Sequence, residues 1–495
     1  MIKRHPRGVL PLILTNMFTR FAFYIIAANL LSFLSAKMNF SWDELNIAYA
    51  IFYFLIFILA FVGGFIADKT RNYKGTILKG AVLMTLGSII IAIPTPAGSS
   101  WIFFGIVCPA LFLIVFGNGL FRSNIYAVLG QMYDNQEYTK MRDSGFLLFN
   151  LFLSIAVLLA PGVAEGIRNY CIMRKGFVYD FDLPQLCHDY IANGKNMDRY
   201  CQFEMLASTS GQGTMEISEF ASQYLQVFST GFSIVFMIAF IVMAISLLIF
   251  LRYEKKFPIP ANLEADSFSM DPKLLRQRAY LFLALFGVLN LFSFASSQDG
   301  TILPIFVRDY VDYQKIPLSP NKLMLLFSIV VIPIILAIFT ILRKKGREPS
   351  TLKKMAWGMG IAAIAFIIMA VGSIGLPGYS VLREMSGLSD EQRVGPVFLI
   401  IAFFIWSIAN VLFAPLLNSF ISQFARPKHQ GIMQSVSLFA SFFGNMLLFL
   451  SFMIYNHIPV WGSWLICAAI CLISMIIMLP VARKMGRILI HNSMK

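Results

Sequence analysis

An arginine in the middle of the first hydrophobic stretch constrains this chain more than any other residue. Arg20 lies near the centre of residues 9–36, which read as a membrane-spanning helix. A charge at mid-bilayer costs at least ~2.5–3.5 kcal/mol unless it faces a wet cavity or a bonding group. Because Asn16, Arg20 and Tyr24 are four residues apart, a helix places them on one face. The pattern indicates a polar face along a solute pathway; the alternative is an arginine bonded to backbone carbonyls of a neighbouring helix.

Hydrophobic stretches of membrane-spanning length recur along almost the whole chain. Of the 495 residues, 58% are hydrophobic and 13% are charged, which excludes a disordered or an ordinary soluble protein. We predict an all-α integral membrane protein with twelve transmembrane helices in two six-helix halves, the major facilitator fold of alternating-access carriers. The predicted spans are residues 9–36, 43–67, 76–95, 101–130, 144–164, 223–251, 278–308, 321–342, 353–375, 395–424, 431–455 and 461–482.

The placement of the basic residues explains the net charge of +15. If the N-terminus is inside, the densest basic clusters, within residues 3–7, 252–278 and 343–354, all fall on the inner side, as the positive-inside rule requires. We therefore predict a plasma or inner membrane location with both termini in the cytoplasm. The charge reports topology, and we do not expect nucleic acid as a partner.

The expected domain boundaries follow from this topology. They are a first half over residues 1–252, a cytoplasmic linker over 253–278 and a second half over 279–495. Residues 165–222 form one sizeable polar insertion, an outer subdomain or a solvated spacer, which holds Cys171, Cys187 and Cys201. One disulfide with a thiol left over would fit an outer location, and the spacing does not reveal the pairing. We expect no metal, no cofactor and no enzyme activity, because no ligand or nucleophile–base spacing occurs.

A short motif follows the second span. Residues 63–74, Gly-Gly-Phe-Ile-Ala-Asp-Lys-Thr-Arg-Asn-Tyr-Lys, resemble the loop 2–3 signature of the major facilitator superfamily. In this reading Gly64, Asp68 and Lys69 form a conformational latch, with Asp68 pairing with basic groups of neighbouring helices. Asn72 replaces a glycine of the signature, and asparagine is the commonest substitute where a helix ends in left-handed geometry.

Further motifs, in order and at matching spacing in both halves, resemble the proton-dependent oligopeptide transporter (POT) family. They are His5-Pro6-Arg7-Gly8, Arg20-Phe21 with Tyr24, Gly117-Asn118-Gly119-Leu120-Phe121-Arg122-Ser123-Asn124, Gln131-Met132-Tyr133-Asp134, Asp143-Ser144-Gly145-Phe146 with Phe149-Asn150, Ala160-Pro161, Gln298-Asp299-Gly300-Thr301, Ala414-Pro415 and Gly444-Asn445. The resemblance implies an alternating-access peptide transporter that is driven by protons.

The chain departs from the family at positions that usually carry charge. The two glutamates of the family's helix 1 are Asn16 and Thr19 here, and the lysine of helix 4 is Arg122. The family tyrosine of helix 5 is Asn150, and the glutamate of helix 10 is Asn410. The family uses these acids to carry protons and to hold the peptide's amino group, so their loss leaves proton coupling open.

One carboxylate remains well inside a predicted span. Asp299 follows Gln298, whereas the family glutamate precedes that glutamine, at the position of Ser297. Positions two residues apart point about 200° apart around a helix. Asp299 is the predicted proton-coupling residue, because a proton symporter needs a titrating group inside the membrane. The alternative is an ion pair with Arg20 or Arg122 that locks the two halves.

The cavity chemistry predicts an amphoteric solute. Arg20 and Arg122 form a positive pole that suits a carboxylate such as a peptide C-terminus, and Asp299 could take an amine. We predict transport of di- or tripeptides or similar small amphoteric solutes, with protons and the lipid bilayer as further partners. An anion-selective facilitator or exchanger, and a non-transporting scaffold that uses residues 165–222, remain open alternatives. The predicted substrate-binding residues are Asn16, Arg20, Tyr24, Asn118, Arg122, Asn150, Gln298 and Asn410.

Overall fold

The computed structural model is helical almost throughout the residues that it describes. These are residues 5–38, 40–94, 103–211, 215–258, 272–313, 316, 318–385, 388, 392–425 and 427–493. Within these ranges, one isolated β-bridge joins Val311 and Val394, and the rest forms helices and their connections. Helices are what an apolar solvent demands, because each one satisfies its backbone hydrogen bonds internally. Half of the predicted linker, residues 259–271, lies outside the described residues.

Eleven of the described helical stretches are long and apolar enough to cross a membrane, and they correspond to eleven of the predicted spans. The twelfth prediction, residues 431–455, falls on two successive helices, α16 (Gln430–Met446) and α17 (Leu448–His457). The eleven stretches are Val9–Lys37, Asp43–Thr70, Tyr73–Ala92, Phe104–Gln131, Thr139–Met173, Ile217–Lys256, Tyr280–Tyr310, Pro320–Lys344, Thr351–Gly372, Val397–Phe424 and Val460–Gly486.

The chain divides into two compact units. Unit 1 comprises Met1–Pro6, Tyr126–Ser154 and Ile259–Lys495, and unit 2 comprises Arg7–Ile125 and Ile155–Pro258. The segment Tyr126–Ser154 therefore packs with the C-terminal part of the chain, although it precedes residue 252. The boundaries at 252 and 279 stay a prediction.

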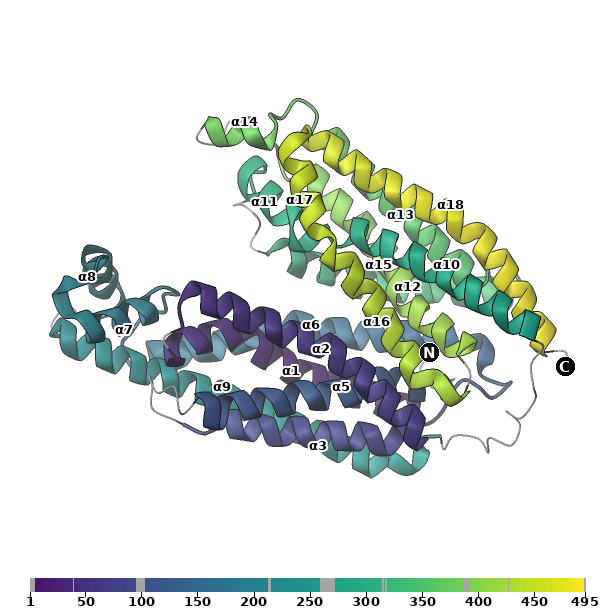
Figure 1. The fold of residues 1–495 in the computed structure, drawn as a ribbon, viewed down its shortest axis with the longest axis horizontal. Helices are drawn as coiled ribbons and strands as arrows, with labels where there is room; N and C mark the ends of the chain where they lie inside the picture. The colour runs from purple at the N-terminus through teal and green to yellow at the C-terminus, as the bar shows by residue number, and fades with distance from the viewer. Residues whose placement is uncertain are drawn as a thin grey trace. The chain divides into compact units, whose positions relative to one another are not determined.

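Unit 2 is built around one long helix. It contains α1 (Val9–Met38), α2 (Trp42–Thr70), α3 (Tyr73–Ala92), most of α5 (Cys108–Gln131), the C-terminal part of α6 (Arg142–Met173), α7 (Leu183–Asn193), α8 (Tyr200–Ser210) and α9 (Ile217–Tyr253). Helices α1, α3 and α7 all pack against α9 (Figure 1). Helices α2 and α5 cross closely, because a Cβ atom added at Gly63 would lie only 2.2 Å from the carbonyl oxygen of Gly119. Glycine pairs of this kind let membrane helices approach.

Unit 1 has an aromatic core. It contains α10 (Pro272–Ser296), α11 (Ile302–Tyr310), α12 (Pro320–Lys344), α13 (Thr351–Gly372), α14 (Tyr379–Glu384), α15 (Val397–Phe424), α16, α17 and α18 (Val460–Ser493). Helix α13 packs between α15 and α18 (Figure 1). The Phe366 ring of α13 lies 4.9 Å from the Trp406 ring of α15 and 6.1 Å from the Trp464 ring of α18, and both tryptophans are fully buried.

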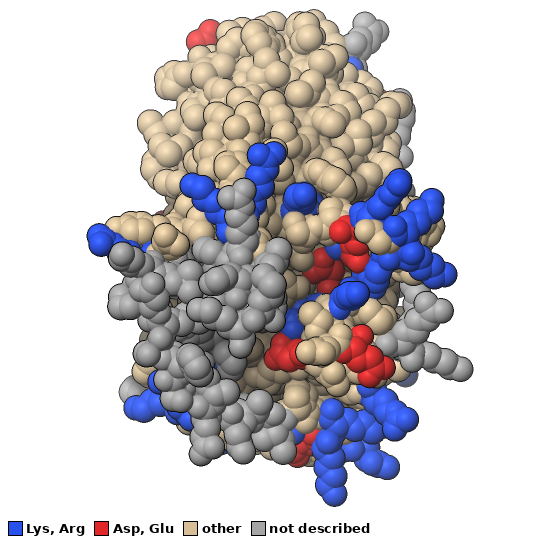
Figure 2. Space-filling view, turned by 90° about the vertical axis from the view of Figure 1, so that its right-hand side faces the viewer, with Lys and Arg blue, Asp and Glu red and all other residues tan. Residues whose placement is uncertain are grey.

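The outer faces of the helices are apolar. On α12, Ile334, Ile338 and Ile341 are each about half exposed and follow one another at helical spacing. A continuous exposed apolar stripe is unstable in water and fits a lipid-facing surface. Charged side chains instead gather in one region of the face shown in Figure 2, and a broad tan area beside them carries almost none. This distribution is that of a multi-pass membrane protein.

The insertion 165–222 contains folded helices. Helices α7 and α8 follow α6 and precede α9, and His188 of α7 bonds through Nε2 to the carbonyl oxygen of Ala36, 2.7 Å away. Cys171, Cys187 and Cys201 are all free thiols, so the disulfide considered from the sequence is not formed. The insertion is held by packing and hydrogen bonds.

Candidate functional site

The polar face predicted on α1 exists, and in unit 2 it meets α5. Asn16, Arg20 and Tyr24 lie on the uninterrupted helix α1. Nη1 of Arg20 donates a hydrogen bond to Oδ1 of Asn118, at 2.7 Å, and the Arg20 side chain is only 5% exposed. The structure thus joins two of the predicted binding residues, from helices about one hundred positions apart in the sequence.

Two polar atoms beside this pair have no hydrogen-bond partner among the described residues. They are Oδ1 of Asn16 and Nδ2 of Asn118, and both side chains are fully buried. A buried polar atom left unpaired costs ~1–3 kcal/mol, so native structures retain few of them. An acceptor and a donor of this kind, beside a buried guanidinium, are suited to bind a polar solute.

The neighbouring positions on α1 and α5 differ in role. Arg122 is half-buried, and its guanidinium carbon lies 6.0 Å from the centre of the Phe57 ring. Tyr24 is also half-buried, with its ring edge-on to that of Phe23. Thr19, which replaces a family glutamate, bonds to Ser246 of α9 at 2.7 Å. Thr19 therefore joins two helices of unit 2.

The remaining predicted binding residues belong to unit 1. Gln298 is fully buried, and its Nε2 donates to the Ser451 hydroxyl at 3.1 Å and to the carbonyl oxygen of Phe294 at 2.6 Å. This amide thus ties the break between α10 and α11 to α17. Asn150 on α6 and Asn410 on α15 are half-buried. A contact of these three residues with a solute stays a prediction.

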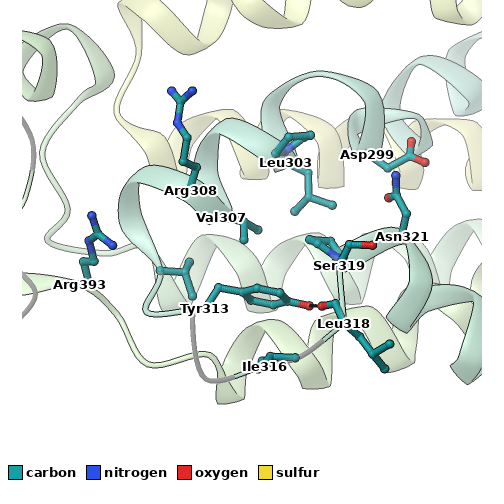
Figure 3. A pocket seen from close by; sticks show the side chains of 13 residues that line it. Asp299, Leu303, Val307, Arg308, Tyr313, Ile316, Leu318, Ser319, Asn321 and Arg393 are labelled. Atoms are coloured by element: carbon teal, nitrogen blue, oxygen red, sulfur yellow. Dashed lines mark hydrogen bonds between the residues drawn. The ribbon is translucent and has the colours of Figure 1, made fainter. Parts of the chain in front are cut away.

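Asp299 lines a pocket of about 650 Å³ within unit 1. It lies in η7 (Gln298–Gly300), the short 3-10 turn between α10 and α11. Figure 3 shows its carboxylate beside Asn321, while Arg308 and Arg393 lie toward the other end of the pocket and apolar side chains lie between. Arg308 is engaged by Asp309 through two hydrogen bonds of 2.7 and 3.0 Å. The pocket has a carboxylate at one end, an apolar middle and basic side chains at the other end.

A buried ionic cluster in unit 1 was not predicted from the sequence. We call it the Asp143 cluster; its members are Asp143, Ser144, Arg343, Glu348, Thr351, Lys354 and Ser419. The Lys354 ammonium lies 2.7 Å from Asp143 and 2.7 Å from Glu348. Thr351 and Ser419 also donate hydrogen bonds to the Asp143 carboxylate, at 3.0 and 2.6 Å. Every oxygen of the buried carboxylate is satisfied, as a buried charge requires.

Arg343 extends the Asp143 cluster. It holds Glu348 with two hydrogen bonds of 2.7 and 3.0 Å and donates to Ser144 at 2.9 Å. Burial raises the pKa of Glu348, but the hydrogen bonds and charges of Arg343 and Lys354 outweigh burial and hold the pKa below its usual value. The sequence signal that could have indicated the cluster is a single acid, Glu348, inside a strongly basic stretch. From the sequence, we use that stretch only to orient the chain in the membrane.

The N-terminal segment is tied to the same region. Nδ1 of His5 lies 2.7 Å from the Tyr133 hydroxyl, and His5 is 9% exposed. The tyrosine ring packs on Gly145, where an added Cβ atom would lie 2.1 Å from its hydroxyl oxygen. Burial lowers the pKa of His5 to about 4, and the nearby Arg343 charge acts in the same direction. His5 is therefore neutral at physiological pH.

The motif after the second span needs one correction. The left-handed residue at the end of α2 is Arg71, with φ of 55°, and Asn72 instead caps α3 by accepting a hydrogen bond from the Gly75 amide. Asp68 is buried and accepts a hydrogen bond from Tyr73 of the following helix at 2.5 Å. Gly64 is buried and Lys69 is exposed. Their action as a latch stays a prediction.

Among the described residues, no group of three or more His, Cys, Asp or Glu side chains is arranged to hold a metal ion.

Known proteins similar to this chain are membrane transporters. The chain is 32% identical to a di-/tripeptide transporter of Lactococcus lactis over 179 residues, and this match spans 35% of the chain and 34% of that relative. It is 24% identical to the peptide transporter YePEPT of Yersinia enterocolitica over 467 residues, 89% of the chain and 86% of the relative. A crystal structure of a POT family transporter in complex with 5-aminolevulinic acid matches the fold with a TM-score of 0.57 at 18% identity, over 97% of both chains.

The profile of the POT family matches residues 74–187 and 269–462, which is more than half of the sequence. The family resemblance carried by the motifs is confirmed. This chain is a member of the POT family of membrane transporters.

Proposed function

We propose that this protein moves di- or tripeptides, or similar small amphoteric solutes, across a plasma or inner membrane by alternating access. The observation that carries the proposal is the buried Arg20–Asn118 pair beside unpaired atoms of Asn16 and Asn118. A guanidinium in that setting suits a carboxylate, and the two amides supply further hydrogen bonds. Relatives named as peptide transporters support the same substrate class.

Asp299 is our candidate for the group that binds the substrate's amine. Its pocket provides a carboxylate for an amine and an apolar wall for a side chain. One similar POT structure binds 5-aminolevulinic acid, which carries an amine and a carboxylate. Arg122, Tyr24, Asn150, Gln298 and Asn410 complete the proposed binding set.

The Asp143 cluster is our candidate for a gate. It clamps the start of α6 to α12, α13 and α15 within unit 1. If both termini are cytoplasmic, this cluster lies on the inner side, because His5 packs beside it. Opening the inner side would then separate these charges, and closing would restore them. A buried ion pair that breaks and re-forms as a unit would supply the two-state element that alternating access requires.

Uptake of a labelled dipeptide into proteoliposomes tests the proposal. We expect uptake with the free dipeptide and strong loss of uptake with a peptide amide that lacks the carboxylate. A folded protein that moves no peptide under any gradient would refute the proposal. An imposed inward proton gradient distinguishes proton-coupled from passive transport. Accumulation of the dipeptide indicates proton coupling, for which Asp299 is the candidate residue. Equilibration without accumulation indicates a passive carrier.

An anion facilitator or exchanger is the second candidate. It is favoured by two arginines on α1 and α5 without a glutamate on α1. A peptide that lacks its amine distinguishes the two functions. A facilitator should carry such an anion at a rate similar to that of the intact dipeptide. An amphoteric carrier that uses Asp299 should carry it much more slowly.

A further inference from the structure

A groove of about 700 Å³ lies in unit 2, between the C-terminal end of α6 and the N-terminal part of α9. Tyr170, Cys171, Arg174 and Lys175 line one side, and Phe177 follows them in the loop. The other side is a stripe of α9 at helical spacing, namely Gln223, Gln226, Val227, Thr230, Gly231 and Ile234. None of these residues belongs to the proposed transport site.

The groove lies where both helices leave the apolar layer. Residues 220–251 of α9 carry no charge, and about 20 residues counted back from Arg252, at 1.5 Å per residue, cover a hydrocarbon core of about 30 Å. Gly231 lies just beyond the end of that 30 Å stretch and faces α6, since an added Cβ atom would lie 3.9 Å from the Cβ atom of Cys171. Arg174 and Lys175 follow Cys171 by about one helical turn. Their charges therefore lie at the level of lipid headgroups.

Polarity changes along the groove as it does along a phospholipid. Arg174 and Lys175 are exposed at its outer end, and they make no ion pair with any described residue. Gln226 and Thr230 come next, and Ile234, 42% exposed, leads to the apolar surface of α9. The apolar surface of α9 continues beyond Ile234 through Met237 and Ile241, which are 40% and 49% exposed. The order is cationic, then neutral polar, then apolar.

No acid is among the residues that line the groove. Glu165 is nine residues before Arg174, which places it on the opposite face of α6. Glu219 of α9 lies one turn beyond Gln223 and accepts a hydrogen bond from that amide at 2.9 Å. Two adjacent cations thus dominate the region where a lipid phosphate would lie.

We infer that this groove binds an anionic phospholipid. Arg174 and Lys175 would hold the phosphate, Gln226 and Thr230 would contact the glycerol and ester groups, and an acyl chain would follow Ile234 down α9. Basic residues at the membrane surface attract anionic lipids with ~1 kcal/mol each. Removal of both should therefore weaken binding on the order of 30-fold.

The chain carries its own reporter for this site. Cys171 lines the groove, whereas Cys201 is exposed on α8 outside it. We would follow alkylation of both thiols by a maleimide in nanodiscs of phosphatidylcholine, with or without phosphatidylglycerol. Phosphatidylglycerol should slow alkylation of Cys171 and leave that of Cys201 unchanged.

Two double variants identify the groups responsible. In R174Q/K175Q the effect of phosphatidylglycerol on Cys171 should disappear. In K195Q/R199Q, which removes the same charge from exposed positions of the same insertion, the effect should persist. A monodisperse profile and an unchanged thermal unfolding temperature report intact folding of each variant.

Native mass spectrometry of the released protein provides a second measurement. The unaltered chain and K195Q/R199Q should retain phosphatidylglycerol, and R174Q/K175Q should lose it. Equal alkylation of Cys171 in both lipid mixtures would overturn the inference. Equal loss of the effect in the two double variants would also overturn it, because only general surface charge would then be involved. Neither result depends on transport.

Discussion

The ammonium nitrogen of Lys354 lies 2.7 Å from Oδ2 of Asp143, and the lysine is only 1% exposed. The two residues are 211 positions apart, on α13 and α6. Removal of one member of a buried ion pair leaves an uncompensated charge, which costs about 3–5 kcal/mol. Lys354→Met should therefore lower the thermal unfolding temperature in detergent strongly. Lys353→Met, at the exposed neighbouring position, should leave the unfolding temperature nearly unchanged.

The double variant Asp143→Asn with Lys354→Met tests the origin of that loss. Since it removes both charges, it should be more stable than Lys354→Met alone. If the double variant loses as much stability, relative to the unaltered chain, as the two single variants lose together, the two residues act independently.

Protonation of His5 should release the N-terminal segment. The pKa of His5 is lowered to about 4 in the folded chain, against 6.5 for a free histidine, so the released segment binds the proton more readily. The packed state is fully favoured above pH 6.5 and loses this advantage as the pH falls from 6.5 toward 4. Amide protection factors around His5, which correct for the slower intrinsic exchange at low pH, should fall over that range. His5→Gln should remove this pH dependence, since an amide stays neutral and can still bond to Tyr133.

The α2–α5 crossing should not tolerate a methyl group. In Gly63→Ala the new Cβ atom would lie 2.2 Å from the Gly119 carbonyl oxygen, so the helices must separate. Overpacking of this kind typically costs about 1–3 kcal/mol. Gly162→Ala on α6, where no atom lies within 4 Å of the added Cβ atom, is the matched control. Comparable thermal stability of the two variants would argue against a close crossing.

Asp299→Asn tests coupling at the remaining carboxylate. The variant cannot titrate, so it should lose proton-driven accumulation of dipeptide and keep exchange of internal for external dipeptide. Asp309→Asn, ten positions along in the same span and paired with Arg308, should keep accumulation. Undiminished accumulation by Asp299→Asn would exclude it as the coupling residue.

Arg20→Gln should weaken binding of a carboxylate. A hydrogen bond to a charged group contributes ~1.5–3 kcal/mol, so the apparent affinity for a dipeptide should fall on the order of 10- to 100-fold. A peptide amide that lacks the carboxylate should bind the variant and the unaltered protein equally. A similar loss for both ligands would indicate a structural role for Arg20.

The sequence predicted what depends on neighbouring residues in the chain. The spans follow from apolar length, because about 20 apolar residues cross a bilayer whatever they pack against. The polar face of α1 follows from the spacing of Asn16, Arg20 and Tyr24 on one helix. The family followed from motifs whose order and spacing are properties of the sequence itself.

Predictions that depended on distant or locally ambiguous contacts were weaker. Asn72 fits both a left-handed helix end and an N-cap, and the short turn between α2 and α3 selects the cap and leaves Arg71 left-handed. Three cysteines in one insertion suggested a disulfide, but Cys187 is fully buried, Cys201 is exposed, and all three are free thiols.

By itself the sequence determined a helical membrane protein with a charged residue in its first span and membership of the POT family. Only the tertiary structure decided which polar residues meet: Arg20 with Asn118 in unit 2, and Asp143 with Lys354 and Ser419 in unit 1. The physical reason is that apolar length and helical period act along the chain. A buried charge instead finds its counter-charge through packing, which brings together residues hundreds of positions apart.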